Sequence, residues 1–332
     1  MFGFVILPFL MLLFSTLRRN KVLIFLSFLL LWLIAGLRDS SVGTDTFNYE
    51  FAFNSFSRGV DRNVEPFWKY LNLLVIKVFG SFQIFLLTAQ VLILIPIYYV
   101  AKKLQLNMFL MLFFYISLYI FAYSLNITRQ CVAISMSLLC LYNVSINQNK
   151  KAFGWSVVSI LFHYSAAVTL LYLIVNKIPT KLPIQLIAMF ATILIGVVIP
   201  GELFGYILSY AYEDYARVSD NVGAFEGNLY FLIILNSFYL FIYWVDGEKG
   251  TFFKAFFLFV LISNMLIRIP FGMRVITYFS VVQIIYFPHL IHNNRLSSKE
   301  VVFFVLVAYA LAIYWMNFGF GGIFPYTFYF DR

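Results

Sequence analysis

The chain has 332 residues, of which 63% are hydrophobic and only 11% are charged. Soluble globular domains carry about 25% charged residues, so this composition excludes a soluble protein. A formal net charge of +9 would suit a nucleic-acid-binding protein, but the basic residues lie in short loops between apolar runs. That distribution follows the rule for cytoplasmic loops of membrane proteins, and we expect no nucleic-acid partner.

Apolar runs of about twenty residues recur along the chain, and a helix of that length crosses a hydrocarbon core of about 30 Å. We therefore predict an all-α polytopic integral membrane protein with a single transmembrane domain over residues 1–332. Basic clusters mark its cytoplasmic loops and place both chain ends outside the cytoplasm. About ten spanning helices are expected, near residues 2–17, 22–37, 82–101, 107–125, 128–146, 184–200, 229–245, 252–269, 271–291 and 300–318.

Two further segments do not read as simple spans. Phe67 to Phe79 carries Lys69 and Lys77 among apolar residues, which predicts an amphipathic helix at the outer membrane interface. Residues 152–176 have basic clusters at both ends. They fit either a broken or re-entrant helix pair that turns near His163, or one ordinary span, and the sequence leaves both open.

The remaining polar segments, 38–66, 201–228 and 319–332, are predicted to be periplasmic. The cytoplasmic clusters consist mainly of lysine, whereas arginine predominates on the outer side. The positive-inside rule accounts for the inner lysines but not for the outer arginines. Because arginine binds phosphate through two parallel hydrogen bonds, the pattern predicts an anionic, phosphate-bearing ligand reached from the periplasm.

The first polar cluster begins with Arg38 and continues through Gly43, Asp45, Asn48 and Tyr49. Gly43 is expected to break the helix and to let backbone amides face a ligand. Asp45 would act as a base or orient a sugar hydroxyl. An ordinary turn after a helix is the alternative, since Gly, Asp, Thr and Asn all favour turns.

Two ionisable residues lie in apolar sequence. Arg129, followed by Gln130, opens a span, and His163 stands alone between aromatic residues. Ionisable groups inside a membrane are functional candidates because burying them is costly. The structural alternatives are an arginine that reaches the interface and a hydrogen-bonded histidine.

Three weaker candidates follow. Arg268 and Arg274 flank the Pro- and Gly-containing break at 269–272, where they would either clamp a diphosphate or border an ordinary loop. Glu65, before a proline, supplies a carboxylate or simply caps a helix. Tyr326 follows a proline in the tail.

The two cysteines and the histidines have no metal-ligand spacing, so we expect no metal and no cofactor.

Six short motifs occur in order: R-x-x-x-V-G-T-D-x-x-N-Y at 38–49, E-P at 65–66, T-R-Q at 128–130, F-H-Y-S-A at 162–166, R-x-x-x-Y-F at 274–279 and P-Y at 325–326. Over nearly the whole chain this set resembles the EpsG/Wzy-type polysaccharide polymerases of bacterial inner membranes. The resemblance implies a metal-independent glycosyltransferase, related to lipid-carrier-dependent (GT-C-like) enzymes, that builds O-antigen, capsular polysaccharide or exopolysaccharide.

The substrate of such an enzyme is an undecaprenyl-diphosphate-linked oligosaccharide, whose lipid carrier lies among the membrane lipids. The enzyme works at the periplasmic face. It transfers the growing chain to the non-reducing end of an incoming unit, and a chain-length-determining co-polymerase is an expected partner. The resemblance implies that Asp45 or His163 takes the acceptor proton, a choice that stays open. Arg129, Arg268 and Arg274 would hold the diphosphate with help from Arg38, and the other motif residues expected at the substrate are Asn48, Tyr49, Glu65, Gln130 and Tyr326.

Two other functions share parts of this pattern. An O-antigen ligase uses the same donor but delivers the chain to lipid A core, and the acidic character of segment 201–228 disfavours it. A lipid-linked oligosaccharide flippase or transporter would need a charged path open to both sides. The polar residues here gather on one side, which disfavours transport.

Overall fold

The computed structural model describes residues 2–198, 229–266, 269, 272–293 and 299–331. Within these ranges the chain is helical and has no strand beyond one isolated β-bridge, which confirms the all-α prediction. The contacts divide it into two compact units. The first comprises Met1–Ala167 and Gln283–Arg332, and the second comprises Val168–Val282. The single transmembrane domain stays a prediction.

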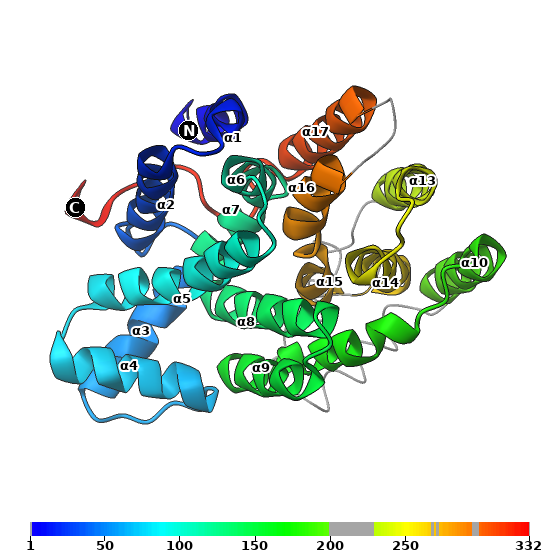
Figure 1. Cartoon of the computed structure of the whole chain (residues 1–332). Helices are drawn as coiled ribbons and strands as arrows, with labels where there is room; N and C mark the ends of the chain where they lie inside the picture. Colours follow the sequence, from blue (N-terminus) through cyan, green and yellow to red (C-terminus); the bar gives the residue numbers. More distant parts are fainter. Residues whose placement is uncertain (1, 199–228, 267–268, 270–271, 294–298, 332) are drawn as a thin grey trace. The chain divides into compact units, whose positions relative to one another are not determined.

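The first unit contains most of the helices (Figure 1). In chain order they are α1 (Phe2–Phe14), α2 (Lys21–Gly36), α3 (Thr46–Ser57), α4 (Pro66–Val78), α5 (Phe82–Lys103), α6 (Met108–Ser117), α7 (Ile120–Asn126), α8 (Thr128–Ser145), α9 (Asn149–Phe162), α16 (Gln283–Asn293) and α17 (Lys299–Asn317), with short 3-10 turns η1 (Ser15–Leu17) and η4 (Tyr329–Asp331).

Three helices of the described chain are long and apolar enough to cross a membrane: Phe82–Lys103, Gly272–Asn293 and Lys299–Asn317. The bent pair α6–α7 adds a fourth if it counts as one span. Several other apolar helices have only 10–17 residues, so the expected number of about ten spans stays a prediction. The shorter ones are Gly3–Leu17, Lys21–Gly36, Leu182–Val198, Tyr230–Val245 and Thr251–Leu266.

The segment predicted as a span at 107–125 forms two helices, α6 and α7, and the chain bends by 60° between them. Tyr119 occupies the break in a left-handed conformation, with φ +65°. A non-glycine residue is strained there. Its hydroxyl accepts a hydrogen bond from Gly319 N at 3.1 Å and donates to Phe320 O at 3.2 Å, so contacts from the C-terminal tail hold the bend.

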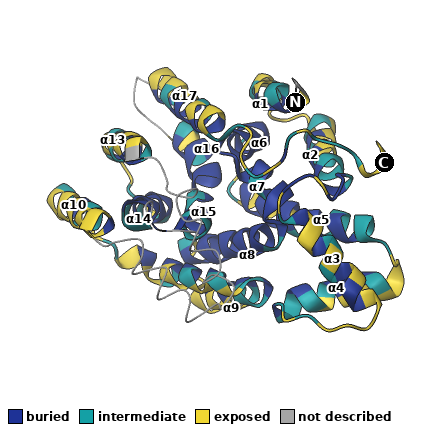
Figure 2. Ribbon diagram, turned by 180° about the vertical axis from the view of Figure 1, so that it is seen from behind, coloured by how far each residue is buried: buried dark blue, intermediate teal, exposed yellow. Residues whose placement is uncertain are grey.

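Helix α8 lies at the centre of the first unit and is buried on nearly every side (Figure 2). All its residues are buried except Arg129 and Ser145, at its two ends. It packs against α5, α7 and α9. Because these neighbouring helices hold α8 in place, the backbone that carries Arg129 has a fixed position.

Helix α9 ends at Phe162, and a 14-residue 3-10 helix, η2 (Tyr164–Lys177), begins after His163. His163 is extended, with φ −159° and ψ 118°. Of the two alternatives that the sequence left open for 152–176, the structure shows the broken helix, with its break at His163. Whether the pair re-enters the membrane stays a prediction. So long a 3-10 stretch is unusual, since such runs seldom exceed a few residues.

The predicted amphipathic helix at 67–79 forms as α4, packed against α3. Trp68 and Val75 are buried on its inner face, whereas Tyr70 and Leu74 are exposed on the opposite face. This two-sided pattern suits a helix that lies in the membrane interface. Its location there stays a prediction.

The second unit contains α10 (Leu182–Val198), α13 (Leu229–Val245), α14 (Thr251–Leu266) and α15 (Gly272–Ser280). Asn236 and Asn264 exchange side-chain hydrogen bonds of 2.7 and 3.0 Å between α13 and α14. Helix α10 packs closely on α14 at Gly196. The missing side chain permits this approach, since a Cβ there would lie 2.0 Å from Asn264 O. Small residues and polar bonds of this kind hold helices together in membranes.

We expect Gly196→Ala to destabilise the protein by about 1–3 kcal/mol, because the added methyl group must push α10 away from α14. Gly154→Ala is the matched control: Gly154 also lies inside a helix, and its Cβ would meet nothing within 4 Å. The thermal unfolding midpoint in detergent should fall for the first variant and hold or rise for the second. Equal midpoints would contradict the close α10–α14 contact.

Candidate functional site

Helices α8 and α9 are antiparallel neighbours, and two hydrogen bonds fix their register (Figure 1). Ser159 Oγ donates to Ala133 O at 2.6 Å, and Ser156 Oγ donates to Cys140 Sγ at 3.1 Å. Moving back along α9 therefore means moving forward along α8. This register brings the start of α8 next to the end of α9.

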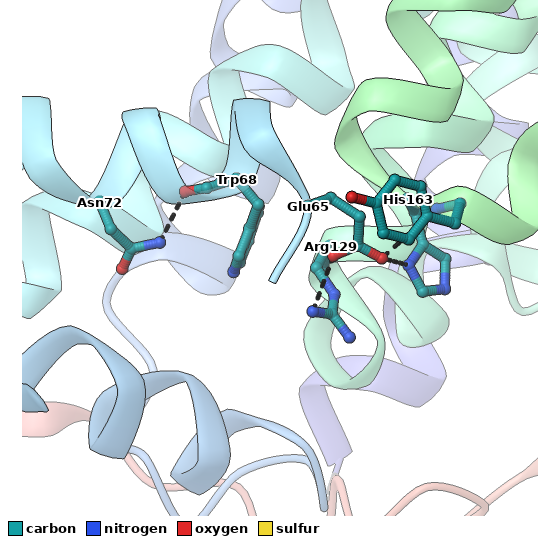
Figure 3. Close-up of polar contacts among 6 residues, drawn as sticks. Glu65, Trp68, Asn72, Arg129 and His163 are labelled. Atoms are coloured by element: carbon teal, nitrogen blue, oxygen red, sulfur yellow. Dashed lines mark hydrogen bonds and ion pairs between the residues drawn. The ribbon is translucent and has the colours of Figure 1, made fainter. Parts of the chain in front are cut away.

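The carboxylate of Glu65 joins the two residues at that end (Figure 3). Its Oε1 lies 2.6 Å from His163 Nδ1, and its Oε2 lies 2.9 Å from Arg129 Nη1. The backbone N–H of Tyr164 also donates to Oε1, at 3.3 Å. Glu65 immediately precedes α4, which starts at Pro66. Three separate segments therefore meet at one carboxylate.

The surroundings of Glu65 favour its ionised form. The residue is only 4% exposed, and burial alone would raise the pKa of its carboxyl group. The hydrogen bond from His163 and the positive charge of Arg129 outweigh that effect, so the pKa lies below its usual value. Glu65 is thus an anion held between a guanidinium and an imidazole.

This contact sets the protonation pattern of His163. Because a carboxylate accepts at Nδ1, the proton of the neutral ring sits on Nδ1 and the basic lone pair sits on Nε2. The side chains of His163 and Arg129 are 14% and 27% exposed, so both reach the surface, whereas that of Glu65 is 5% exposed. A carboxylate that orients a histidine beside a cation is a general-base arrangement.

The junction between α7 and α8 ties the polar cluster at 38–49 to the same helix. Asn126 Oδ1 accepts from Thr44 Oγ1 at 2.9 Å and from Asp45 N at 3.0 Å. Asn126 is the last residue of α7, and Arg129 is the second residue of α8. Asp45 is thus anchored within one turn of the backbone that carries Arg129.

The expectation that the amides near Gly43 face a ligand is wrong. Gly43 N donates to Gly322 O at 2.9 Å, and Thr44 N donates to Gly321 O at 3.2 Å. The next amide, of Asp45, is bonded to the junction as described. Glycine is needed at position 43 because φ is +86° and a Cβ would lie 2.4 Å from a backbone carbonyl of α7.

Arg38 is fully buried, with no exposed surface. Its Nη2 donates to Thr128 Oγ1 at 2.8 Å, and its Nη1 donates to Ala35 O. The guanidinium thus connects the end of α2 to the first residue of α8. Its burial favours a positioning role over direct contact with a diphosphate.

The other predicted residues of the first unit lie around this frame. The hydroxyl of Tyr326 donates to a backbone carbonyl of α2. The ring of Tyr49 packs edge-on against Trp68, with 5.4 Å between centroids. Gln130 is buried on α8, and Asn48 is exposed on α3.

The other two arginines predicted to hold the diphosphate belong to the second unit. Arg274 is partly exposed on α15 of the second unit. Arg268 and segment 201–228 lie outside the described residues. A diphosphate clamp made by Arg129, Arg268 and Arg274 therefore stays a prediction.

Asn126 and the tail glycines 321–322 were not predicted to belong to this frame. Both had a local signal: a polar residue at the end of an apolar run, and a Gly-Phe-Gly-Gly run in the tail. Within the described ranges no three His, Cys, Asp or Glu side chains gather as metal ligands would. The two cysteines are buried and not disulfide-bonded.

A comparison with family models matches residues 21–328 to the model described as the EpsG family. Neither a curated protein nor a solved structure matches the chain.

We expect Glu65 to lower the stability of the fold as the pH becomes acidic. Because its pKa is lowered from the ordinary 4.5, the ionised carboxylate stabilises the fold above that pH, and the contribution is lost as pH falls through the lowered pKa. Glu65→Gln should therefore flatten the acid limb of the thermal midpoint plotted against pH. Asp61→Asn is the control, because Asp61 pairs with Lys69 on the surface, where ion pairs contribute little. Identical acid limbs in wild type and Glu65→Gln would contradict the buried pair.

Proposed function

This chain belongs to the EpsG family, and we propose that it is a polysaccharide polymerase of the bacterial inner membrane with its site at the periplasmic face. Family membership gives it a polysaccharide polymerase-type, glycosyltransferase-like function in a membrane. The finer proposal is that it joins repeat units carried on undecaprenyl diphosphate. The contact of Glu65 with His163 and Arg129 supports this most, because it pairs a base with a cation.

In the proposed reaction, a hydroxyl oxygen at the non-reducing end of an incoming lipid-linked unit attacks the anomeric carbon of the growing chain. The new glycosidic bond forms as the bond between that carbon and the diphosphate oxygen breaks. The electron pair of the broken bond leaves with undecaprenyl diphosphate, and the hydroxyl proton passes to a base. The site must therefore supply a base and offset the charge of the leaving group.

His163 is our proposed base. Glu65 keeps the proton on Nδ1, so Nε2 is the nitrogen that accepts the hydroxyl proton. The carboxylate then stabilises the imidazolium that forms, as in carboxylate–histidine pairs of hydrolases. This dyad favours His163 over Asp45, which was the other candidate from the sequence. We assign Asp45 the alignment of the attacking hydroxyl.

Arg129 is our proposed contact for the diphosphate. Its guanidinium is held at Nη1 by Glu65 and remains partly exposed. A preorganised planar fork can bind phosphate oxygens and offset charge as the bond breaks. Arg38 would position the start of α8 from below the surface. A diphosphate-binding role for Arg268 and Arg274 rests on the sequence alone.

One assay separates this proposal from the two alternatives. Purified protein is given lipid-linked repeat units and nothing else. A polymerase lengthens them into a ladder of chains, a ligase makes none without lipid A core, and a flippase makes none under any condition. No ladder from folded wild-type protein would overturn the proposal.

We expect His163→Ala to lower the polymerisation rate by on the order of 10²–10⁴-fold, the usual loss of a general base. Arg129→Ala should lower it by on the order of 10²–10³-fold, the usual loss of a preorganised electrostatic donor. Initial rates of ladder formation measure both effects.

Arg58→Ala is the matched control, because Arg58 is an exposed arginine at the end of α3. This variant should keep the wild-type rate. All three variants should be compared at equal amounts of folded protein in the membrane. A normal ladder from both His163→Ala and Arg129→Ala would remove the proposed base and cation.

A further inference from the structure

Residues 319–331 run back along the first unit without forming an α-helix, and we call them the C-terminal strap (Figure 1, red). Asp39 N donates to Thr327 O at 3.0 Å, and Tyr329 N donates to Leu37 O at 3.1 Å. These two bonds flank the isolated antiparallel β-bridge. The strap is therefore paired with the backbone that follows α2.

The strap also binds the loop at residues 43–45. Two of its carbonyls, of Gly322 and Gly321, accept the amides of Gly43 and Thr44. The third amide of that loop is bonded to Asn126. Every backbone donor of the loop is thus satisfied, two of them by the strap.

The glycines of the strap allow this close approach. Gly321 and Gly322 have φ of +85° and +66°, which side chains rarely adopt. A Cβ on Gly321 would lie 2.9 Å from Asn126 Nδ2, and one on Gly322 would lie 3.1 Å from Thr44 Cγ2. Asn126 is therefore enclosed by the strap on one side and by the loop on the other.

We propose that the C-terminal strap is a positioning element of the polymerase site, which keeps Asp45 in place through the 43–45 loop and Asn126. The inference rests on the proposed function. Asp45 stands at the start of α3, and its amide is tied to the junction from which α8 begins. Without the strap, two amides of the loop lose their acceptors, and the loop is free to leave the junction.

A cysteine pair tests whether the strap stays docked during the reaction. Ser41 Oγ and Thr327 Oγ1 lie 3.2 Å apart on the surface, between the strap and the segment after α2. The natural cysteines, Cys131 and Cys140, are buried and not disulfide-bonded, so they should not crosslink to the introduced cysteines in the folded protein. In Ser41→Cys/Thr327→Cys, oxidation should leave two maleimide-reactive thiols after denaturation, whereas each single variant keeps three.

We expect the crosslinked protein to make the ladder at the wild-type rate. Failure to crosslink in the folded protein would overturn the docked strap. Loss of the ladder on oxidation, with recovery on reduction, would show that the strap must move and would overturn a fixed positioning role. Absence of a ladder from wild type would instead contradict the proposed function and leave the crosslinking result as it stands.

Two glycine variants test the path through Asn126. Gly319 and Gly321 have similar left-handed φ values, +90° and +85°, but a Cβ on Gly319 meets nothing within 4 Å. Gly319→Ala therefore adds backbone strain alone, whereas Gly321→Ala also displaces the amide of Asn126. Both should lower the thermal midpoint.

Only Gly321→Ala should lower kcat per folded molecule, by on the order of tenfold or more, with little change in KM for the lipid-linked unit. A purely structural strap would give both variants the same kcat per folded molecule, and that result would overturn the inference.

Thr44→Ser, which keeps the hydroxyl bonded to Asn126, should retain activity, and Thr44→Val should lose it in the same way as Gly321→Ala. Equal kcat values for the two Thr44 variants would count against the path through Asn126.

Discussion

A buried carboxylate needs both charge compensation and hydrogen bonds, and Glu65 obtains them from segments that are distant in the sequence. Arg129 supplies the charge from the start of α8, and His163 supplies a hydrogen bond from the end of α9. Removing either partner leaves the Glu65 carboxylate with less compensation in a poorly solvated position, which is costly in proteins. The α8–α9 register, the start of α4 and the break after α9 are all consistent with this single contact.

The same contact gives the site its chemical character. A neutral histidine without a fixed tautomer carries its basic lone pair on Nε2 only part of the time, and an arginine without a fixed partner samples many rotamers. Glu65 restricts both, while the buried body of α8 restricts the backbone beneath Arg129. Asn126 and Arg38 extend this frame to the loop at 43–45 and to α2. Preorganisation of this kind lets charges act on a transition state without first having to reorganise.

Much of the helical layout could be predicted because it depends on local apolar runs. A helix forms at Thr128–Ser145, where a span was expected at 128–146, and the break at His163 is one of the two alternatives that the sequence left open. The bend at Tyr119 could not be predicted, because the residue lies in an unbroken apolar run and its left-handed conformation depends on contacts with the tail.

The sequence singled out Glu65, Arg129 and His163 as candidates, but not the geometry that brings them together. Glu65 and His163 are 98 residues apart, and no local pattern pairs them. Arg38 looked like a ligand contact because its charge is unusual at the end of a span, yet it is buried against Thr128. The amides near Gly43 were expected to face a ligand, but two of them donate to carbonyls from the far end of the chain, and no local pattern reveals that pairing.

Through its contact with Nδ1, Glu65 fixes the proton of the neutral His163 ring on that nitrogen. Nitrogen-15 NMR of histidine-labelled protein in lipid, at a pH where the ring is neutral, measures this directly, with the His163 signal assigned from its loss in His163→Gln. The account predicts a protonated Nδ1 and an unprotonated Nε2 in wild type, and a mixture of tautomers in Glu65→Ala. A proton on Nε2 in wild type would contradict it.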